Sequence, residues 1–338
     1  MKRICLIATG GTIACVQTEQ GFVPGLSGRD LLARVPDLGD VAAIDVQQIM
    51  NIDSSEMQVS DWRSIARAVF GAAEAYDGVV ITHGTDTMCY TAAALSFMLS
   101  DLRIPVVMTG AQRPLLLEDS DAVNNLRDAC AVAVYGEPGV SIVFNHKIIH
   151  GSRAFKMYSK NDDAYVSRNY PYLGKIENGR VIWQHHARIQ SGQPRLFVSL
   201  NENVALLKLT PASNPSALDY VAKYGFSGVV IEGFGTGGIA NLNRGMAQGI
   251  RRLTDELRMP VLMISQCPYD GVNLAVYGIG EQAAKAGVIP GNDMTTETAV
   301  VKLMWALGKT QNMSEIAELL ESNICDEITG ERKIQPAD

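Results

Sequence analysis

The chain has 338 residues, of which 47% are hydrophobic and 19% charged, a composition typical of a soluble globular protein with room for two domains. Its net charge of −7 disfavours nucleic acid or an acidic membrane surface as the main partner. No apolar run has the length of a membrane-spanning helix, and only three residues precede the first apolar run, so we expect neither a membrane anchor nor a signal peptide. Six scattered cysteines without zinc or CxxC spacing favour a reduced, cytoplasmic protein without a structural metal.

Two similar strand-to-turn patterns organise the first third of the chain. The segments ICLIATGGTIA (4–14) and GVVITHGTDTM (78–88) each begin as a buried strand and end in a glycine-bearing turn with several hydroxyl side chains. The glycines, Gly10, Gly11 and Gly84, let the backbone turn sharply and approach a ligand closely. Threonines on two such turns are therefore expected to meet over one site.

Strands alternate with helical patterns through the rest of this half, which indicates a mostly parallel sheet. The expected elements are a mobile loop over 15–28, a helix over 29–35, a strand over 41–50 with a polar turn at 51–55, a helix capped by Ser60 and Asp61, a helix over 92–99, a strand over 104–108, a helix over 119–135 and a strand over 140–145. Ligands of such sheets bind at the carboxyl ends of the strands, where loops converge and helix N-termini offer free N–H groups.

Residues 146–190 look irregular, with short strand-like pieces at 146–150 and 174–183, and beyond them the alternation of strand and helix resumes. We predict an α/β fold with two parallel-sheet βα domains, an N-terminal catalytic domain over 1–190 and a smaller, flavodoxin-like domain over 204–338, joined by a linker over 191–203. The helices expected in the second domain include one over 241–257. The charged tail from Asp326 is predicted to be partly disordered.

The turns carry groups suited to acyl transfer. Thr12 needs a base to become a nucleophile, and Lys156, in GSRAFK, is a candidate if a closed pocket favours its neutral form. Thr85 can relay a proton, Asp86 can pair with a substrate ammonium, and Ser54 with nearby N–H groups can receive a carboxylate. The alternative is that these are well-capped turns that bind a phosphate or have no catalytic role.

Other motifs point less clearly to function. The spacing of Gly233, Gly235 and Gly238 formally matches a dinucleotide fingerprint, although a tight turn is the simpler interpretation. His185 and His186 have no partner at metal spacing, so a solvated loop is expected.

Several segments resemble the bacterial-type L-asparaginase family. Residues 6–14 and 78–88 are similar to its two signature motifs and occur in the same order, and likeness extends to TGAQRP (109–114), GSRAFK (151–156) and AGVIPGNDMT (286–295). The resemblance covers nearly the whole chain and is nearest to the cytoplasmic type I branch.

This resemblance implies hydrolysis of asparagine to aspartate and ammonia through a threonine nucleophile and an acyl-enzyme, without a cofactor or a metal. Thr12 would be the nucleophile, supported by Thr85, Asp86 and Lys156. The resemblance also implies a homotetramer of close dimers and, in some members, allosteric asparagine binding near the segment of Cys267. The residues implied in substrate binding are Gly11, Asp53, Ser54, Ser55, Gly84 and Ala111.

Two positions depart from the family pattern. Phe22 stands where the family usually has a loop tyrosine beside the nucleophile, and phenylalanine has no hydroxyl. Either another tyrosine replaces it, with Tyr277 as the candidate, or Thr12 depends on Lys156 through Thr85. Gly238 stands where relatives often carry an asparagine that reaches the substrate.

We therefore predict an L-asparaginase acting on a small amino acid, with neither nucleic acid nor a membrane as partner. Two alternatives are an ammonia-supplying glutaminase component of a tRNA-amidotransferase, whose relatives carry extra N-terminal residues, and a non-catalytic amino-acid sensor.

Overall fold

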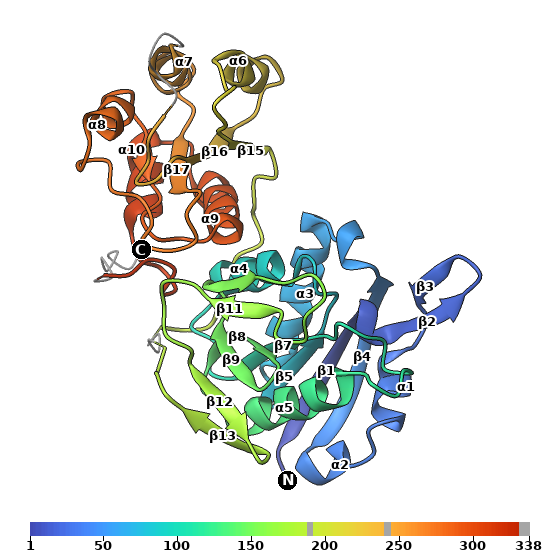
Figure 1. The fold of residues 1–338 in the computed structure, drawn as a ribbon. Coiled ribbons are helices and arrows are strands. Elements are labelled where there is room, and N and C mark those ends of the chain that lie inside the picture. Colours follow the sequence, from blue (N-terminus) through green and yellow to red (C-terminus); the bar gives the residue numbers. More distant parts are fainter. Residues whose placement is uncertain (188–191, 240–244, 331–338) are drawn as a thin grey trace. The chain divides into compact units, whose positions relative to one another are not determined.

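The computed structural model describes residues 1–187, 192–239 and 245–330, and the chain divides into two compact units, Met1–Val198 and Ser199–Asp338 (Figure 1). Within the described ranges no helix is long and apolar enough to cross a membrane. The boundaries expected from the sequence stay a prediction, and residue 191, where the expected linker begins, lies outside the described residues.

The first unit is built on an eight-stranded sheet with the order β13-β12-β9-β8-β7-β5-β1-β4. Its strands are β1 (Arg3–Gly10), β4 (Ala43–Ile52), β5 (Gly78–Thr82), β7 (Pro105–Thr109), β8 (Gly139–Phe144), β9 (Lys147–His150), β12 (Gly174–Glu177) and β13 (Arg180–Trp183). All pairings from β4 to β8 are parallel, whereas β9, β12 and β13 are added antiparallel. The expected α/β architecture is confirmed, with an antiparallel extension on one side.

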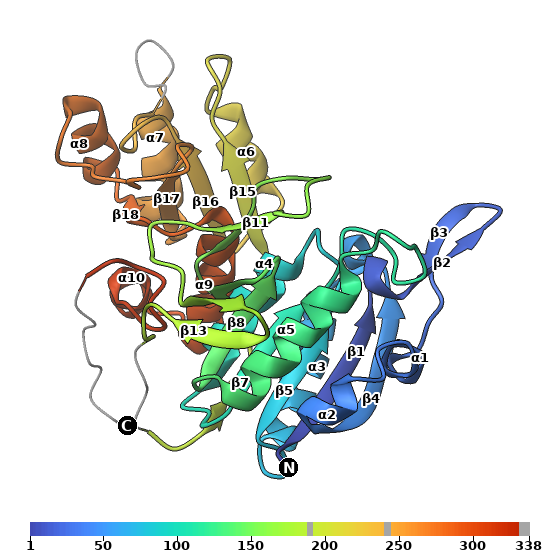
Figure 2. The same cartoon turned by 60° about the horizontal axis from the view of Figure 1, so that its bottom comes forward.

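Helices cover both faces of this sheet (Figures 1 and 2). They are α1 (Gly28–Ala33), α2 (Leu38–Val41), α3 (Val59–Ala72), α4 (Met88–Met98) and α5 (Ala122–Tyr135). Leu31, Leu38 and Leu126, from α1, α2 and α5, pack in one core with Leu6 and Val80 of the sheet, while α3 and α4 lie on the other face. Every residue of β5 and β7 is buried as a result, which is why both strands are continuous apolar runs.

Helix α3 begins slightly earlier than expected. Its N-cap is Gln58, and the Asp61 carboxylate accepts the Gln58 backbone N–H at 2.9 Å. Ser60 therefore lies inside the first turn and is not the cap, while Asp61 takes part in the capping as predicted.

The stretch expected as a mobile loop over 15–28 contains a hairpin of β2 (Cys15–Thr18) and β3 (Gly21–Pro24), which extends away from the large sheet (Figures 1 and 2). Both faces of its tip are exposed, so its sequence lacks the alternation that marks a half-buried strand. Two further short pairs complete the unit: β6 (Leu99–Ser100) with β14 (Arg195–Leu196), and β10 (Ala154–Lys156) with β11 (Tyr165–Ser167).

The second unit has the expected smaller parallel sheet, with the order β15-β16-β17-β18. Its elements are β15 (Val204–Lys208), α6 (Ser216–Lys223), β16 (Gly228–Gly233), α7 (Met246–Arg251) continued by a π-helical turn at Arg252–Glu256, β17 (Val261–Ser265), α8 (Gly278–Lys285), β18 (Ile289–Pro290), α9 (Thr296–Lys309) and α10 (Met313–Glu321). Residues 241–244 of the helix expected over 241–257 lie outside the described residues.

Of the charged tail that was predicted to be partly disordered, residues 326–330 are ordered, and residues 331–338 lie outside the described residues. Glu327 is fully buried and forms an ion pair with the equally buried Lys302 at 2.6 Å. Lys302 also donates to the carbonyl oxygens of Leu320 and Ser322, at 2.9 and 2.5 Å. Glu327, one of the charged residues that suggested solvation, is therefore part of a buried polar network.

Removing one side of this buried pair should destabilise the second unit. We expect Lys302→Met to lower the free energy of unfolding by about 3–5 kcal/mol, because Glu327 would stay buried without its cation. The double variant Lys302→Met with Glu327→Gln should lose less free energy of unfolding. Lys285→Met, which removes an exposed ion pair with Glu281, should change the free energy of unfolding by at most about 1 kcal/mol. Urea unfolding measures all three, and equal effects at Lys302 and Lys285 would contradict the prediction.

The same pair predicts an acid-labile second unit. Burial is the largest influence on Glu327 and favours its neutral form, but Lys302 and the backbone N–H groups of Cys325 and Ile324 outweigh it, so the net pKa lies below the ordinary 4.5. This stabilisation is therefore present above the unfolded-state value of 4.5 and decreases as the pH falls through the lower pKa of the folded state.

Candidate active site

The two signature turns are in direct backbone contact. Strands β1 and β5 pair in parallel, with Ala8 opposite Thr82, so their following turns leave the same edge of the sheet side by side. Gly11 has a φ of +78°, and a Cβ on it would lie 2.3 Å from the Gly84 nitrogen. Only glycine allows this approach, which brings the turn of Thr12 against the turn that carries Thr85.

The turn after β4 completes the floor of the site. A Cβ on Gly84 would lie 2.6 Å from the Ser54 Cβ and Oγ. The Asp86 backbone N–H donates to the Ser54 Oγ at 3.2 Å, and the Thr87 Oγ1 donates to the Ser54 carbonyl at 2.8 Å. Ser54 is 3% exposed, so its hydroxyl lies between two turns and keeps its own proton available to a ligand.

Lys156 reaches these turns from β10. Its Nζ donates to the Thr85 Oγ1 at 2.7 Å and to the Asp86 Oδ1 at 2.6 Å. Thr85 is buried, the Lys156 side chain is 15% exposed, and the Asp86 side chain is 69% exposed. A partly desolvated amine thus lies between a buried hydroxyl and a carboxylate that remains open to solvent.

The remaining predicted residues differ in their surroundings. Thr12 opens a short 3₁₀ turn and is half-buried, and no residue in the described ranges hydrogen-bonds its hydroxyl. The Asp53 Oδ1 accepts from the Ser55 N–H at 2.8 Å and from the Ser55 hydroxyl at 2.7 Å, and Ala111 is fully buried.

The two positions connected with the missing loop tyrosine lie in different units. Phe22 is on β3, with half of its surface exposed. Tyr277 belongs to the second unit, where it is the exposed N-cap residue of α8. A role for Tyr277 stays a prediction.

His83 contributes to the site in a way that sequence reasoning missed. It is fully buried, with Nδ1 2.7 Å from the Gly84 carbonyl and Nε2 2.9 Å from the Thr91 Oγ1. Burial lowers its pKa to about 4, against a smaller opposite effect of the Gly84 carbonyl. The ring is therefore neutral at pH 7, and the carbonyl requires the proton to be on Nδ1. The sequence could have indicated His83 as a site residue, because it lies inside the HGTDT motif.

Tyr165 is a second missed residue. Its hydroxyl donates a short hydrogen bond to the Thr85 carbonyl, and the side chain is buried. Burial, reinforced by Cys89 and Asp86, raises its pKa well above the ordinary value. Tyr165 is thus a neutral donor that holds the backbone of the second turn, in a stretch whose sequence looked irregular.

The contact between the turns leads to a prediction about Gly11. Gly11→Ala should lower kcat/KM at least about 100-fold, because the added Cβ forces apart two turns whose alignment matters at the scale of 1 Å. Gly21→Ala is the matched control, since Gly21 also has a positive φ, +109°, but nothing lies within 4 Å of its added Cβ. Steady-state kinetics of both variants test this, and equal effects would contradict it.

An α/β fold with a polar cluster at the carboxyl edge of a parallel sheet suits an enzyme of the amidohydrolase class. Comparison with known proteins supports this class. Residues 3–188 match the family model "Asparaginase, N-terminal", and residues 203–320 match "Glutaminase/Asparaginase C-terminal domain". The chain belongs to the asparaginase family.

Individual relatives are similar to this chain over nearly its whole length. The chain is 43% identical to an L-asparaginase of Thermococcus kodakarensis, over 97% of this chain and 99% of that protein. A solved structure of the thermostable L-asparaginase from that organism has a TM-score of 0.92 and 42% identity, over 97% of this chain and 100% of that one. The chain is also 38% identical to a component of the glutamyl-tRNA(Gln) amidotransferase of Methanopyrus kandleri, over 100% of this chain and 78% of that protein.

Proposed function

We propose that this enzyme hydrolyses L-asparagine to L-aspartate and ammonia. The observation that carries the proposal is the cluster of Lys156, Thr85 and Asp86, with the Lys156 Nζ within 2.7 Å of both partners, on a turn in backbone contact with that of Thr12. Two hydroxyls, an amine and a carboxylate at one edge suit amide hydrolysis of a small zwitterion. The identity to an L-asparaginase over nearly the full chain adds support.

In the proposed reaction, the Thr12 Oγ attacks the side-chain amide carbon and loses its proton toward Thr85 and Lys156. The C–N bond then breaks, and the leaving nitrogen takes a proton to depart as ammonia. Water attacks the resulting ester, its C–O bond to Thr12 breaks, and aspartate leaves. Backbone N–H groups of the glycine-bearing turns stabilise the oxyanion, each contributing roughly 10²–10³ in rate.

Substrate binding would use the charges at the rim of the cluster. The exposed Asp86 carboxylate suits the α-ammonium, and the turn of Asp53, Ser54 and Ser55 suits the α-carboxylate. Asp86 would then turn from Lys156 toward the substrate. The Lys156 amine would then keep its contact with the Thr85 hydroxyl, toward which the Thr12 proton moves.

The test is ammonia release from asparagine and glutamine by the full-length enzyme. We expect turnover of asparagine. Preference for glutamine would favour the amidotransferase-type alternative, which the relative from Methanopyrus kandleri supports. Binding of asparagine without any turnover would favour a sensor and overturn the proposal.

Assembly and location are also proposals. A homotetramer, a cytoplasmic location and an allosteric response to asparagine are expectations drawn from the family resemblance. Sedimentation of the purified enzyme at several concentrations tests the first, and a sigmoidal dependence of rate on asparagine tests the last.

A further inference from the structure

The hairpin of β10 and β11 brings two groups to the same residue, Thr85. Lys156 and Tyr165 are opposite each other in its register, and they reach the Thr85 hydroxyl and the Thr85 carbonyl, respectively. The loop that joins them, 157–164, is exposed from residue 157 to 161. The position of the amine therefore depends on whatever holds this loop.

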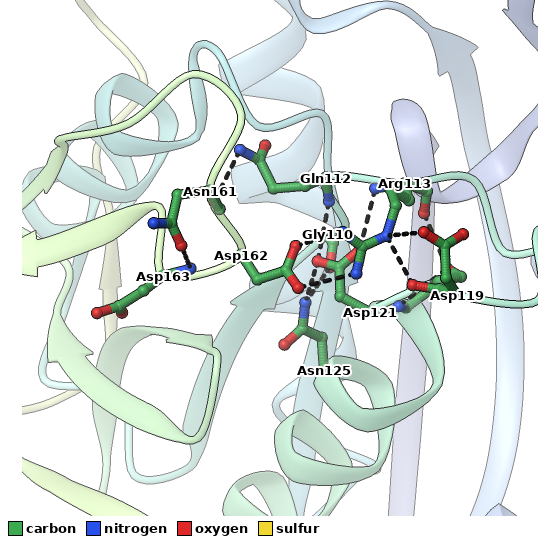
Figure 3. Close-up of polar contacts among 11 residues, drawn as sticks. Gly110, Gln112, Arg113, Asp119, Asp121, Asn125, Asn161, Asp162 and Asp163 are labelled. Carbon is green, nitrogen blue, oxygen red and sulfur yellow. Dashed lines mark hydrogen bonds and ion pairs between the residues drawn. The ribbon is translucent and has the colours of Figure 1, made fainter.

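The loop is held by the segment after β7 (Figure 3) and also by Lys147 of β9, whose Nζ donates to the two Asp163 carboxylate oxygens at 2.5 and 2.7 Å. The Arg113 Nη2 donates to the Asp162 Oδ2 at 2.8 Å, and Nη1 lies 2.8 Å from Oδ1 without being aligned for a hydrogen bond. One residue away, the Gln112 Nε2 donates to the Asn161 carbonyl at 3.1 Å. The hydrogen bond with Asp162 is also the main reason why the pKa of Arg113 is raised.

The backbone and the Nε of Arg113 are themselves held by hydrogen bonds. The backbone N–H groups of Gln112 and Arg113 both donate to the Asp121 carboxylate at 2.9 Å, and the Arg113 Nε donates to the Asp119 carbonyl at 2.6 Å (Figure 3). The guanidinium is therefore held in place independently of the hairpin that it contacts.

The same segment also contacts the turn of the proposed nucleophile. The Leu115 N–H donates to the Ile13 carbonyl at 3.3 Å, one residue after Thr12. The segment that carries Arg113 therefore contacts both parts of the site. Leu115 hydrogen-bonds the Thr12 turn, and Arg113 hydrogen-bonds Asp162 in the loop that follows Lys156.

We propose that Arg113 and Asp162 form a positioning pair that sets the Lys156 hairpin against the turns of Thr85 and Thr12. This inference rests on the proposed function for its kinetic part only. Arg113 and Asp162 act through Lys156 and touch no reacting atom. Their loss therefore changes the alignment of the amine with Thr85, while the substrate-binding turn at 53–55 belongs to a different strand.

Arg113→Gln and Asp162→Asn should each lower kcat about tenfold, because small displacements of a catalytic group are costly, with KM changed less than twofold. The double variant should be no slower than either single one, since both remove the same interaction. Arg113→Lys should recover part of the rate. Arg127→Gln is the matched control, because it removes another Arg–Asp ion pair. The Arg127 Nε lies 2.7 Å from the Asp37 Oδ2, and the two side chains are 45% and 46% exposed. The kcat of this control should stay that of the wild type.

Hydrogen exchange supplies a readout that needs no activity. Met157 donates its N–H to the Ala164 carbonyl at 2.7 Å, so this amide reports on the closed end of the hairpin. Peptides covering 154–167 should exchange about tenfold faster in Arg113→Gln and Asp162→Asn than in Arg127→Gln. Unchanged exchange, or kcat losses that multiply in the double variant, would overturn the positioning pair. Wild-type enzyme that releases no ammonia from asparagine would instead overturn the proposed function, and the exchange result would still decide the pair.

Discussion

Replacing Thr12 with alanine should lower kcat for asparagine on the order of 10⁴-fold or more, because no other step forms the acyl-enzyme once the nucleophile is gone. Thr12 opens the turn that Gly11 brings against Gly84, and its side chain is half-buried. Thr12→Ser keeps a hydroxyl at the same position and should retain measurable turnover. Steady-state ammonia release over a range of asparagine concentrations measures each kcat.

The control for this variant is Thr18→Ala, on the neighbouring hairpin. Thr18 is exposed and its hydroxyl donates to the Gly21 carbonyl at 2.8 Å, so its loss should leave kcat near the wild-type value. Thermal unfolding of Thr12→Ala should resemble that of the wild type. A Thr12→Ala enzyme that keeps most of its turnover would exclude Thr12 as the nucleophile.

Lys156→Met should lower kcat by about 10³–10⁴-fold, toward the upper end of what a single acid–base group contributes. The reason is the 2.7 Å hydrogen bond between the Lys156 Nζ and the Thr85 Oγ1. In the proposed reaction, the proton of Thr12 moves toward this pair. Methionine keeps most of the length of the side chain, so packing is largely preserved. Rapid-quench or steady-state measurement of ammonia release determines the effect.

A second substitution separates two roles of the lysine. Lys156→Arg keeps a donor toward Thr85 and Asp86, but the guanidinium stays protonated and cannot accept a proton. It should be nearly as slow as Lys156→Met. Near-normal activity of Lys156→Arg would show that the positive charge alone is needed. Lys175→Met, which removes an exposed ion pair with Glu177, should have no effect on kcat.

Where the sequence pattern and the burial agree, the fold is predictable. The apolar runs that become β5 and β7 are covered on both faces, so each is a continuous hydrophobic segment between glycine- and threonine-rich turns. The turns of Gly11 and Gly84 were recognisable for a related reason, since only glycine permits their close contact. Both signals are local in the sequence.

What could not be predicted depends on contacts between distant residues. Tyr165 lies 80 residues from the Thr85 carbonyl to which it donates, and its own segment has no periodicity. Likewise, Glu327 is indistinguishable in sequence from the charges of a solvated tail until its buried partner, Lys302, is known. The exposed hairpin of β2 and β3 was missed because neither face of its tip contributes to a core.

The contact of Gly11, Gly84 and Ser54 has a consequence for attempts to engineer this enzyme toward other amides. The floor of the site is largely main chain, with a Cβ at Gly11 only 2.3 Å and one at Gly84 only 2.6 Å from a neighbouring atom. Neither glycine offers a side chain that can be trimmed to make room for a longer substrate, and neither can be enlarged to exclude one. Libraries aimed at altered selectivity should therefore leave Gly11 and Gly84 unchanged and vary side chains elsewhere around the site.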